Sequence, residues 1–298
     1  MNYNRLGKST LKISEIGFGC MSMGKEDNLN AALINRALDL GINFFDTADL
    51  YGFGMNELSL GKSLKHRRKE AVIATKVGNQ WKEDRSGWEW NPGKEYILAA
   101  ADKSLMRLNT DYIDLYQLHG GTMEDRLEDI IEAFELLKVQ GKIRQYGISS
   151  IRPNVIREYI NRSSMVTVMM QYSLLDRRPE QICNSFLLPN SMGILARGSL
   201  AKGLLAGKQI TSYLNYSEEE VKLAAGVIRE LSGVLRTPVQ TALRFVLQQP
   251  FVKVTLVGIR TMDQLIEAAK TSDSPPLAKN EMSMLSESIA ANQYDQPT

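Results

Sequence analysis

The chain has 298 residues, of which 43% are hydrophobic and 23% are charged, proportions typical of a globular protein in water. Its formal net charge of +2 at pH 7 gives no electrostatic reason to expect binding to nucleic acid or to a membrane surface. There is no apolar run as long as the roughly 18 residues that a membrane-spanning helix needs, so none is predicted.

The opening residues, MNYNRLGKSTLKIS, lack the basic and then apolar plan of a signal peptide, and a cytoplasmic protein is expected. The two cysteines, Cys20 and Cys183, are too few for a disulfide framework, which fits a reducing compartment. His66 and His119 are the only histidines, and no paired-histidine or paired-cysteine spacing occurs. The sequence therefore predicts no metal site.

Short apolar runs alternate with amphipathic helical patterns along the chain. The first expected strand, residues 14–19, overlaps the segment RLGKSTLKISEIG, which predicts a short hairpin that plugs the bottom of a barrel. Further strands are expected at residues 42–47, 71–76, 112–119, 143–149, 165–171, 192–198 and 252–258. The spacing of apolar residues predicts helices over 28–41, 93–109 and 124–141, with Gly41 and Gly141 at their C-caps.

The pattern gives eight strands, each followed by at least one helix, with no linker rich in Pro, Ser or Gly. Runs such as AVIAT and MVTVMM are apolar on both faces, as in a parallel sheet covered by helices. This predicts an α/β protein folded as a (β/α)8 TIM barrel, with residues 1–298 forming a single domain. A doubly wound open sheet is the alternative. Residues 274–298 predict an extra C-terminal helix and a tail.

Polar side chains end three consecutive predicted strands, where the active site of a parallel barrel forms. Asp46 ends the second strand, Tyr51 lies in the loop beyond, Lys76 ends the third and His119 ends the fourth. Asp46 can supply the counter-charge that a buried Lys76 requires. An ammonium beside a phenol stabilises the phenolate, so Tyr51 can act as a general acid near neutral pH. Alone, these groups could be a structural ion pair and a core histidine; together they favour catalysis.

Seven motifs follow one another between residues 41 and 270, within a resemblance that covers roughly residues 3 to 270: GINFFDTADLYG, VIATKVG, DYIDLYQLHG, YGISS, MMQYSLLDR, GSLAKGLLAGK and TLVGIRTMDQLIEAAK. Together they resemble the aldo-keto reductase family, in particular its bacterial NADPH-dependent oxidoreductases. The resemblance implies the (β/α)8 fold and the reduction of a small aldehyde or ketone by NADPH, without a metal. It also implies a tetrad in which Asp46 pairs with Lys76, Lys76 activates Tyr51, Tyr51 protonates the substrate and His119 positions its carbonyl.

The same resemblance implies an NADPH molecule extended across the barrel mouth. Ser149 and Gln171 would hold the carboxamide of the nicotinamide. Arg260 would bind the 2′-phosphate, which favours NADPH over NADH, and Gln264 and Glu267 would contact the adenosine. The complete set of expected cofactor contacts is Gly19, Cys20, Ser149, Ser150, Gln171, Arg197, Gly198, Ser199, Leu200, Gly258, Arg260, Gln264 and Glu267.

Four positions depart from the family pattern. Val257 stands where a proline precedes the glycine. Ser150 and Ala268 stand where asparagine is common, which weakens one contact to the carboxamide and one to the adenine. Arg197 stands where a tyrosine or tryptophan usually packs on the nicotinamide. An arginine stacked there would disfavour the positively charged oxidised ring, so we expect tighter binding of the reduced cofactor. Alternatively, Arg197 pairs with Asp49 or Asp176.

All three tryptophans lie in one predicted loop, residues 79–94. They could wall an apolar substrate pocket or pack beneath the loop and hold it down. Trp81 is nearest in sequence to Lys76, and with Met21 it is expected to line the pocket.

Two other functions remain open. One is a regulatory subunit that binds NADP(H) with little or no catalysis, which the departures at Ser150 and Arg197 leave possible. The other is a lyase that forms a Schiff base on Lys76. Asp46 argues against the lyase, because a carboxylate partner would keep Lys76 protonated and poorly nucleophilic.

Overall fold

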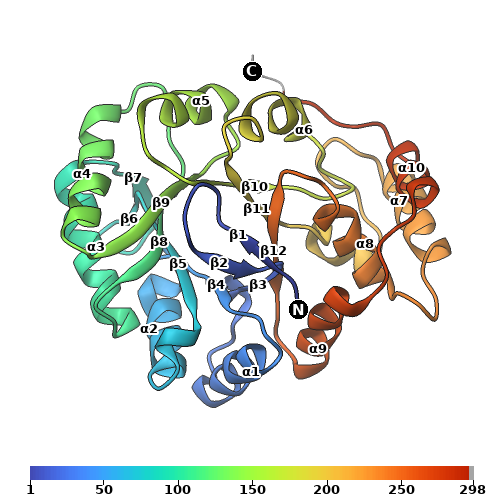
Figure 1. Cartoon of the computed structure of the whole chain (residues 1–298), viewed down its shortest axis with the longest axis horizontal. Helices are drawn as coiled ribbons and strands as arrows, with labels where there is room; N and C mark the ends of the chain where they lie inside the picture. The colour runs from blue at the N-terminus through green and yellow to red at the C-terminus, as the bar shows by residue number, and fades with distance from the viewer. Residues whose placement is uncertain (295–298) are drawn as a thin grey trace.

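Eight parallel strands close into a barrel in the computed structural model, which describes residues 1–294 (Figure 1). Each strand is hydrogen-bonded to the next around the ring, in the order β3 (Ile16–Gly19), β4 (Phe44–Asp46), β5 (Val72–Val77), β8 (Ile113–Leu118), β9 (Ile143–Ser149), β10 (Thr167–Gln171), β11 (Gly193–Arg197) and β12 (Val252–Gly258). The (β/α)8 barrel is confirmed, and the open doubly wound sheet is wrong.

Helices connect the strands and surround the barrel (Figure 1). They are α1 (Asp27–Asp39), α2 (Met55–Leu64), α3 (Lys94–Leu108), α4 (Leu127–Val139), α5 (Pro153–Arg162), α6 (Glu180–Ile182), α7 (Glu218–Glu230), α8 (Pro238–Leu247), α9 (Met262–Lys270) and α10 (Lys279–Glu287). Gly41 and Gly141 follow α1 and α4 with φ of 86° and 74°, as C-cap glycines do. The predicted C-terminal helix is α10, and the last four residues of the predicted tail, 295–298, lie outside the described residues.

Side chains alternate along each strand, so every second residue points into the barrel. At the N-terminal end, these inward residues form one buried apolar cluster that includes Phe44, Val72, Ala74 and Leu115. Two residues further along β4, β5 and β8, the same inward positions are held by the polar side chains Asp46, Lys76 and Gln117. The barrel interior is therefore apolar at one end and carries its buried charges at the other.

The N-terminal hairpin closes the apolar end of the barrel. Its strands, β1 (Tyr3–Arg5) and β2 (Lys12–Ser14), pair antiparallel across that end (Figure 1). Leu6 and Ile13 are fully buried in the same cluster as the inward strand residues. Gly7 passes so close to the barrel that a Cβ there would lie 2.0 Å from the carbonyl oxygen of Val166. The predicted plug is confirmed, and it leaves the opposite end as the open mouth.

The tryptophan-rich loop contains a second hairpin that was not predicted, with strands β6 (Asn79–Trp81) and β7 (Trp88–Trp90). Trp90 anchors it: its Nε1 donates to Asp125 Oδ1 at 2.8 Å. Its ring also covers Gly78, where a Cβ would lie 2.6 Å from the ring. Trp90 therefore holds the hairpin down, as one of the two interpretations of the loop expected.

Within residues 1–294, no helix is long and apolar enough to cross a membrane.

Candidate active site

Lys76 lies inside the open end of the barrel with 1% of its surface exposed. Its Nζ donates to Asp46 Oδ1 and to the Thr47 carbonyl oxygen, each at 2.6 Å, and to the Tyr51 hydroxyl at 3.4 Å. Burial alone would lower the pKa of Lys76, but the Asp46 carboxylate and Tyr51 outweigh it and raise that pKa. Lys76 is therefore a charged ammonium, held between a carboxylate and a phenol.

His119 follows β8 and faces Tyr51 edge-on, with ring centroids 6.1 Å apart and planes at 82°. Burial lowers the pKa of His119 to about 3, and the nearby cations Lys76 and Arg197 contribute to the shift. Its imidazole is therefore neutral near pH 7, and its Nδ1 is buried without a hydrogen-bond partner among the described residues. His119 can orient a substrate by hydrogen bonding, but it holds no extra proton to give. The four predicted tetrad residues thus lie together.

The backbone N–H of Asp49 donates to the Lys76 carbonyl oxygen at 3.4 Å, and the predicted pairing of Asp49 with Arg197 is wrong. The charged groups around Asp49 are Glu57, Arg107 and Lys76. Glu57 is fully buried and pairs with Arg107 at 2.6 Å, whereas Asp49 Oδ1 is buried with no hydrogen-bond partner within residues 1–294. Burial, reinforced by the Glu57 carboxylate, raises the pKa of Asp49 to about 8 against the opposing pull of Arg107. Asp49 is therefore largely protonated at neutral pH.

This shift predicts that an Asp49→Asn variant is more stable than wild type above about pH 4. Unfolded Asp49 ionises near pH 4, whereas the folded carboxyl keeps its proton up to about pH 8. Between these values unfolding releases a proton, so wild-type stability falls as pH rises, by at most about 1.4 kcal/mol per unit. Asparagine does not titrate. Urea unfolding of both proteins between about pH 5 and pH 8 measures how much the free energy of unfolding of the variant exceeds that of wild type. An excess that stays constant across that range contradicts the prediction.

Arg197 is exposed at the mouth and pairs with neither of the two predicted carboxylates. Its Nη1 donates to Gln171 Oε1 at 2.9 Å, while Asp176 accepts two hydrogen bonds of 2.7 Å from Arg178. Gln171 Nε2 donates in turn to the Tyr213 hydroxyl at 3.0 Å. Each end of the Gln171 amide thus makes one hydrogen bond and keeps capacity for a second, because the oxygen has two lone pairs and the NH2 group has two hydrogens. Tyr213 lies in an irregular segment, and sequence reasoning missed it.

Two serines predicted to contact the cofactor already have hydrogen bonds. The Ser150 hydroxyl accepts from the backbone N–H of Arg152 at 3.2 Å, and Ser199 Oγ accepts from Thr255 Oγ1 at 2.6 Å. Ser199 is buried, whereas Ser149 at the end of β9 is half-buried. Ser149 is thus the more accessible of the predicted hydroxyl contacts.

Gly19 and Gly258 are register partners at the C-terminal ends of β3 and β12. The Cys20 thiol is fully buried and lies 3.7 Å from the Phe18 carbonyl oxygen. The backbone of Cys20 is buried as well, and its carbonyl oxygen accepts from Asn56 Nδ2 at 2.8 Å, so the predicted contact of Cys20 with a cofactor stays a prediction.

The N-terminus of α9 carries the residues expected to bind the adenosine end of the cofactor. Thr261 caps the helix by accepting from the Gln264 N–H at 3.3 Å, and the Arg260 N–H donates to Gln264 Oε1 at 2.9 Å. The Arg260 guanidinium is exposed and makes no ion pair within the described residues. Glu267 lies one turn further along, while Ala268 is buried in the core. A free guanidinium at a helix N-terminus fits a phosphate.

Trp81 lies beside the loop that carries Tyr51. Its Nε1 donates to the Leu50 carbonyl oxygen at 3.1 Å, and its ring stacks on Phe53 with centroids 4.1 Å apart. Met21, just beyond β3, is 70% exposed. Their roles as walls of a substrate pocket stay a prediction.

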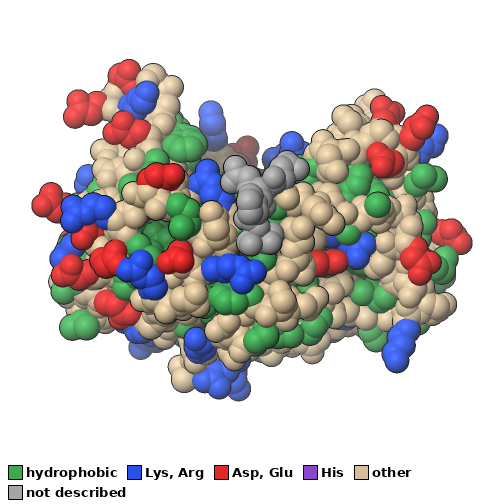
Figure 2. All heavy atoms as spheres, turned by 90° about the horizontal axis from the view of Figure 1, so that it is seen from above, with side chains coloured by type: hydrophobic (Ala, Val, Ile, Leu, Met, Phe, Trp, Pro, Cys, Tyr) green, Lys and Arg blue, Asp and Glu red, His purple; other side chains and the backbone are tan. Residues whose placement is uncertain are grey.

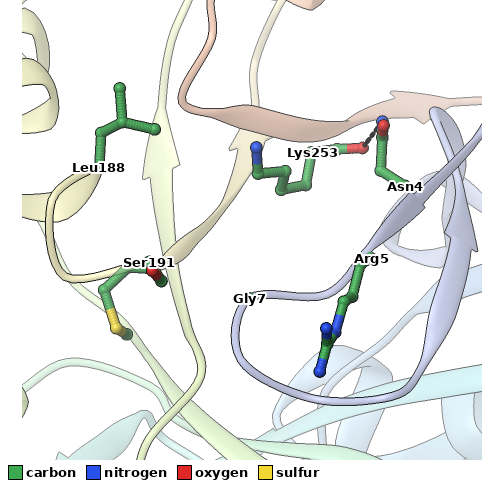
Figure 3. A pocket seen from close by; sticks show the side chains of 7 residues that line it. Asn4, Arg5, Gly7, Leu188, Ser191 and Lys253 are labelled. Atoms are coloured by element: carbon green, nitrogen blue, oxygen red, sulfur yellow. Dashed lines mark hydrogen bonds between the residues drawn. The ribbon is translucent and has the colours of Figure 1, made fainter.

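The molecular surface is hollowed between two raised shoulders at the top of Figure 2. A separate cavity of about 290 Å³ lies near the N-terminal hairpin and the first residues of β11 and β12 (Figure 3). Its cations are already engaged, since Arg5 donates to the backbone carbonyls of Ser9 and Lys8, and Lys253 Nζ donates to that of Pro250. This cavity lies at the end of the barrel opposite the tetrad.

Comparison with known sequences shows what this chain is similar to. The model of the Aldo/keto reductase family matches residues 15–290. The uncharacterized oxidoreductase YqkF of Bacillus subtilis is 45% identical over 294 residues, which cover 96% of this chain and 95% of that protein. The aldo-keto reductase yakc (NADP(+)) of Schizosaccharomyces pombe is 35% identical over 213 residues, or 68% of this chain and 62% of that protein.

Among solved structures, the holo form of aldo-keto reductase AKR11C1 from Bacillus halodurans superposes with a TM-score of 0.93 at 44% identity, over 99% of both chains. Its apo form superposes with a TM-score of 0.84 at 41% identity, also over 99% of both chains. The described conformation is thus more similar to the holo form.

Proposed function

The chain belongs to the aldo/keto reductase family, and we propose that it uses NADPH to reduce an aldehyde or ketone to the alcohol, with Tyr51 as the general acid. One observation carries this proposal: the buried Lys76 ammonium is held between the Asp46 carboxylate and the Tyr51 hydroxyl at the open end of the barrel. A phenol in that position can give a proton to an oxygen that gains negative charge. Bound NADPH supplies the hydride.

Each tetrad residue has a distinct task in this reaction. Tyr51 donates its proton to the carbonyl oxygen of the substrate, and Lys76 stabilises the phenolate that remains. Asp46 holds Lys76 in place and keeps it charged. Neutral His119 orients the carbonyl by hydrogen bonding, and its pKa of about 3 leaves Tyr51 as the proton donor near neutral pH.

The residues at the mouth fit NADPH. The guanidinium of Arg260, which is exposed and has no ion pair within residues 1–294, suits the 2′-phosphate, because arginine binds phosphate oxygens with two parallel hydrogen bonds. Ser149 and Gln171 would hold the carboxamide, with Gln171 using the second hydrogen-bonding position of its oxygen or its NH2 group. The relative yakc carries NADP(+) in its name, which favours the same cofactor here.

An Arg260→Ala variant is therefore expected to bind NADPH about 10- to 100-fold more weakly, since a charge-assisted hydrogen bond is worth about 1.5–3 kcal/mol. NADH lacks the 2′-phosphate, so its dissociation constant should change little. Titration of both cofactors against both proteins, followed by tryptophan fluorescence, measures the two effects. Equal weakening for NADPH and NADH would assign Arg260 a role unrelated to the phosphate.

The proposed function is tested by following the loss of reduced-nicotinamide absorbance with a panel of aldehydes and ketones, together with chromatographic detection of the alcohol. Turnover with at least one carbonyl class, and formation of the matching alcohol, is expected. Tight NADPH binding without turnover across the panel would contradict the proposal and favour a regulatory subunit.

A Schiff-base lyase is disfavoured by the surroundings of Lys76. Its ammonium donates to three acceptors and is kept charged, so no lone pair is free to attack a carbonyl. Borohydride treatment with substrate, in the absence of NADPH, is expected to leave the mass of the protein unchanged.

A further inference from the structure

The catalytic tyrosine is followed by three residues with left-handed backbone. In η2 (Tyr51–Gly54), φ is 56° at Gly52 and 59° at Phe53, and at Gly54 it is 82°. Glycine adopts this region freely, but a residue with a Cβ is strained there. Phe53 therefore adds strain to the segment directly after Tyr51, and something must hold it in place.

Contacts with the β6–β7 hairpin hold Phe53. Its ring lies 4.1 Å from that of Trp81, with planes tilted by 30°, and the Arg85 guanidinium lies 5.4 Å from its centroid. Phe53 is nevertheless 47% exposed, so burial in a core does not account for its conformation. Strain that is held by a specific contact beside reacting groups is typical of a functional constraint.

Trp81 contacts the loop that carries Tyr51 on both sides of that residue. Its indole N–H bonds to the carbonyl of Leu50, just before Tyr51, and its ring stacks on Phe53, two residues after it. Trp81 also ends β6, which follows β5 along the chain after Gly78. The strand that carries Lys76, β5, is therefore followed within a few residues by Trp81, which contacts the loop of Tyr51.

We propose that Phe53 is a positioning residue: its stacking on Trp81 holds the Tyr51 hydroxyl against Lys76. The contact to be held is long, at 3.4 Å, so a small movement of the loop breaks it. The proposal rests on the proposed function, since it assigns Phe53 an effect on proton donation by Tyr51. It predicts that losing the stacking lowers kcat even where backbone strain is relieved.

Three substitutions separate stacking from strain. Phe53→Ala removes the ring and keeps the strain, Phe53→Gly removes both, and Phe53→Tyr keeps both. The alanine and glycine variants are expected to lose about 10- to 100-fold in kcat, the scale of a misplacement near 1 Å. The Phe53→Gly variant should unfold at a higher temperature than Phe53→Ala, because glycine adopts the left-handed region freely. The Phe53→Tyr variant should keep the wild-type kcat.

A matched control is Ser191→Gly, because Ser191 also has a left-handed φ of 56° but is exposed, near the N-terminal hairpin. It should unfold at a higher temperature than wild type with unchanged kcat. A wild-type kcat in Phe53→Gly, or a rise in KM alone, would overturn the proposal and make Phe53 a substrate contact.

Hydrogen exchange separates this proposal from the proposed function. The backbone amides of residues 50–54 are expected to exchange faster in Phe53→Ala than in wild type or Phe53→Tyr, whether or not a substrate is turned over. Unchanged exchange in Phe53→Ala would overturn the proposal that Phe53 holds this segment in place. If wild type turned over no carbonyl but Phe53→Ala still exchanged faster than wild type, the positioning role of Phe53 would be supported and only the reductase activity would be refuted.

Discussion

A Tyr51→Phe variant is expected to lose about 10²–10⁴-fold in kcat, the usual contribution of a positioned general acid, and to fold like wild type. Phenylalanine keeps the ring, which packs edge-on against His119 and lies 5.0 Å from Lys76 Nζ. Only the hydroxyl beside the Lys76 ammonium is removed, and with it the proton for the substrate oxygen. Initial rates at saturating NADPH and carbonyl, with a separate measurement of NADPH affinity, separate lost chemistry from lost binding.

Tyr3→Phe is the matched control for this variant. This substitution also removes one hydrogen-bonding hydroxyl, which in wild type donates to the Gly41 carbonyl oxygen at 2.8 Å near the N-terminal hairpin. Its kcat should equal that of wild type. If Tyr51→Phe also kept its full kcat, the proton would have to come from another group, and the assignment of Tyr51 would fail.

The barrel and the tetrad could be predicted because both follow from local patterns. A strand that is apolar on both faces and ends in a charge, as at Lys76, has a simple explanation: its last inward position lies beyond the apolar filling of the barrel. Asp46 ends the neighbouring strand β4 and pairs in register with Ala74, two residues before Lys76 on the same inward face. Register and the two-residue period then bring the two together without knowledge of the loops.

Features that depend on contacts between distant loops could not be predicted in this way. The strands of the β6–β7 hairpin have only three residues each, too short to show a period. The stacking of Phe53 on Trp81 joins two separate loops, and the charged groups nearest Asp49 include Glu57 of α2 and Arg107 of α3. Charge alone suggests a carboxylate partner for Arg197, the alternative to stacking on the nicotinamide, whereas in the structure it bonds to the neutral side chain of Gln171.

Replacing Lys76 with methionine is expected to cost about 3–5 kcal/mol of folding stability as well as nearly all turnover. Within the described residues, Lys76 is the only cation bonded to the buried Asp46 carboxylate, and the carboxylate's other side-chain contact there is a 3.5 Å hydrogen bond from Gln117. Methionine has a similar length and fills the space, so the loss reflects a buried charge left without its partner. Urea unfolding at pH 7 and initial rates measure the two effects.

The double variant Lys76→Met/Asp46→Asn separates the structural role of the pair from its chemical role. Asparagine removes the uncompensated charge, so most of the lost stability should return, because an ion pair replaced as a whole by neutral groups is often nearly neutral in free energy. Turnover should not return, since the Tyr51 phenolate still lacks the ammonium that stabilises it. Recovery of kcat together with stability would instead show that Lys76 only holds the barrel mouth in shape, because a general acid that works equally well without its cation does not depend on that charge.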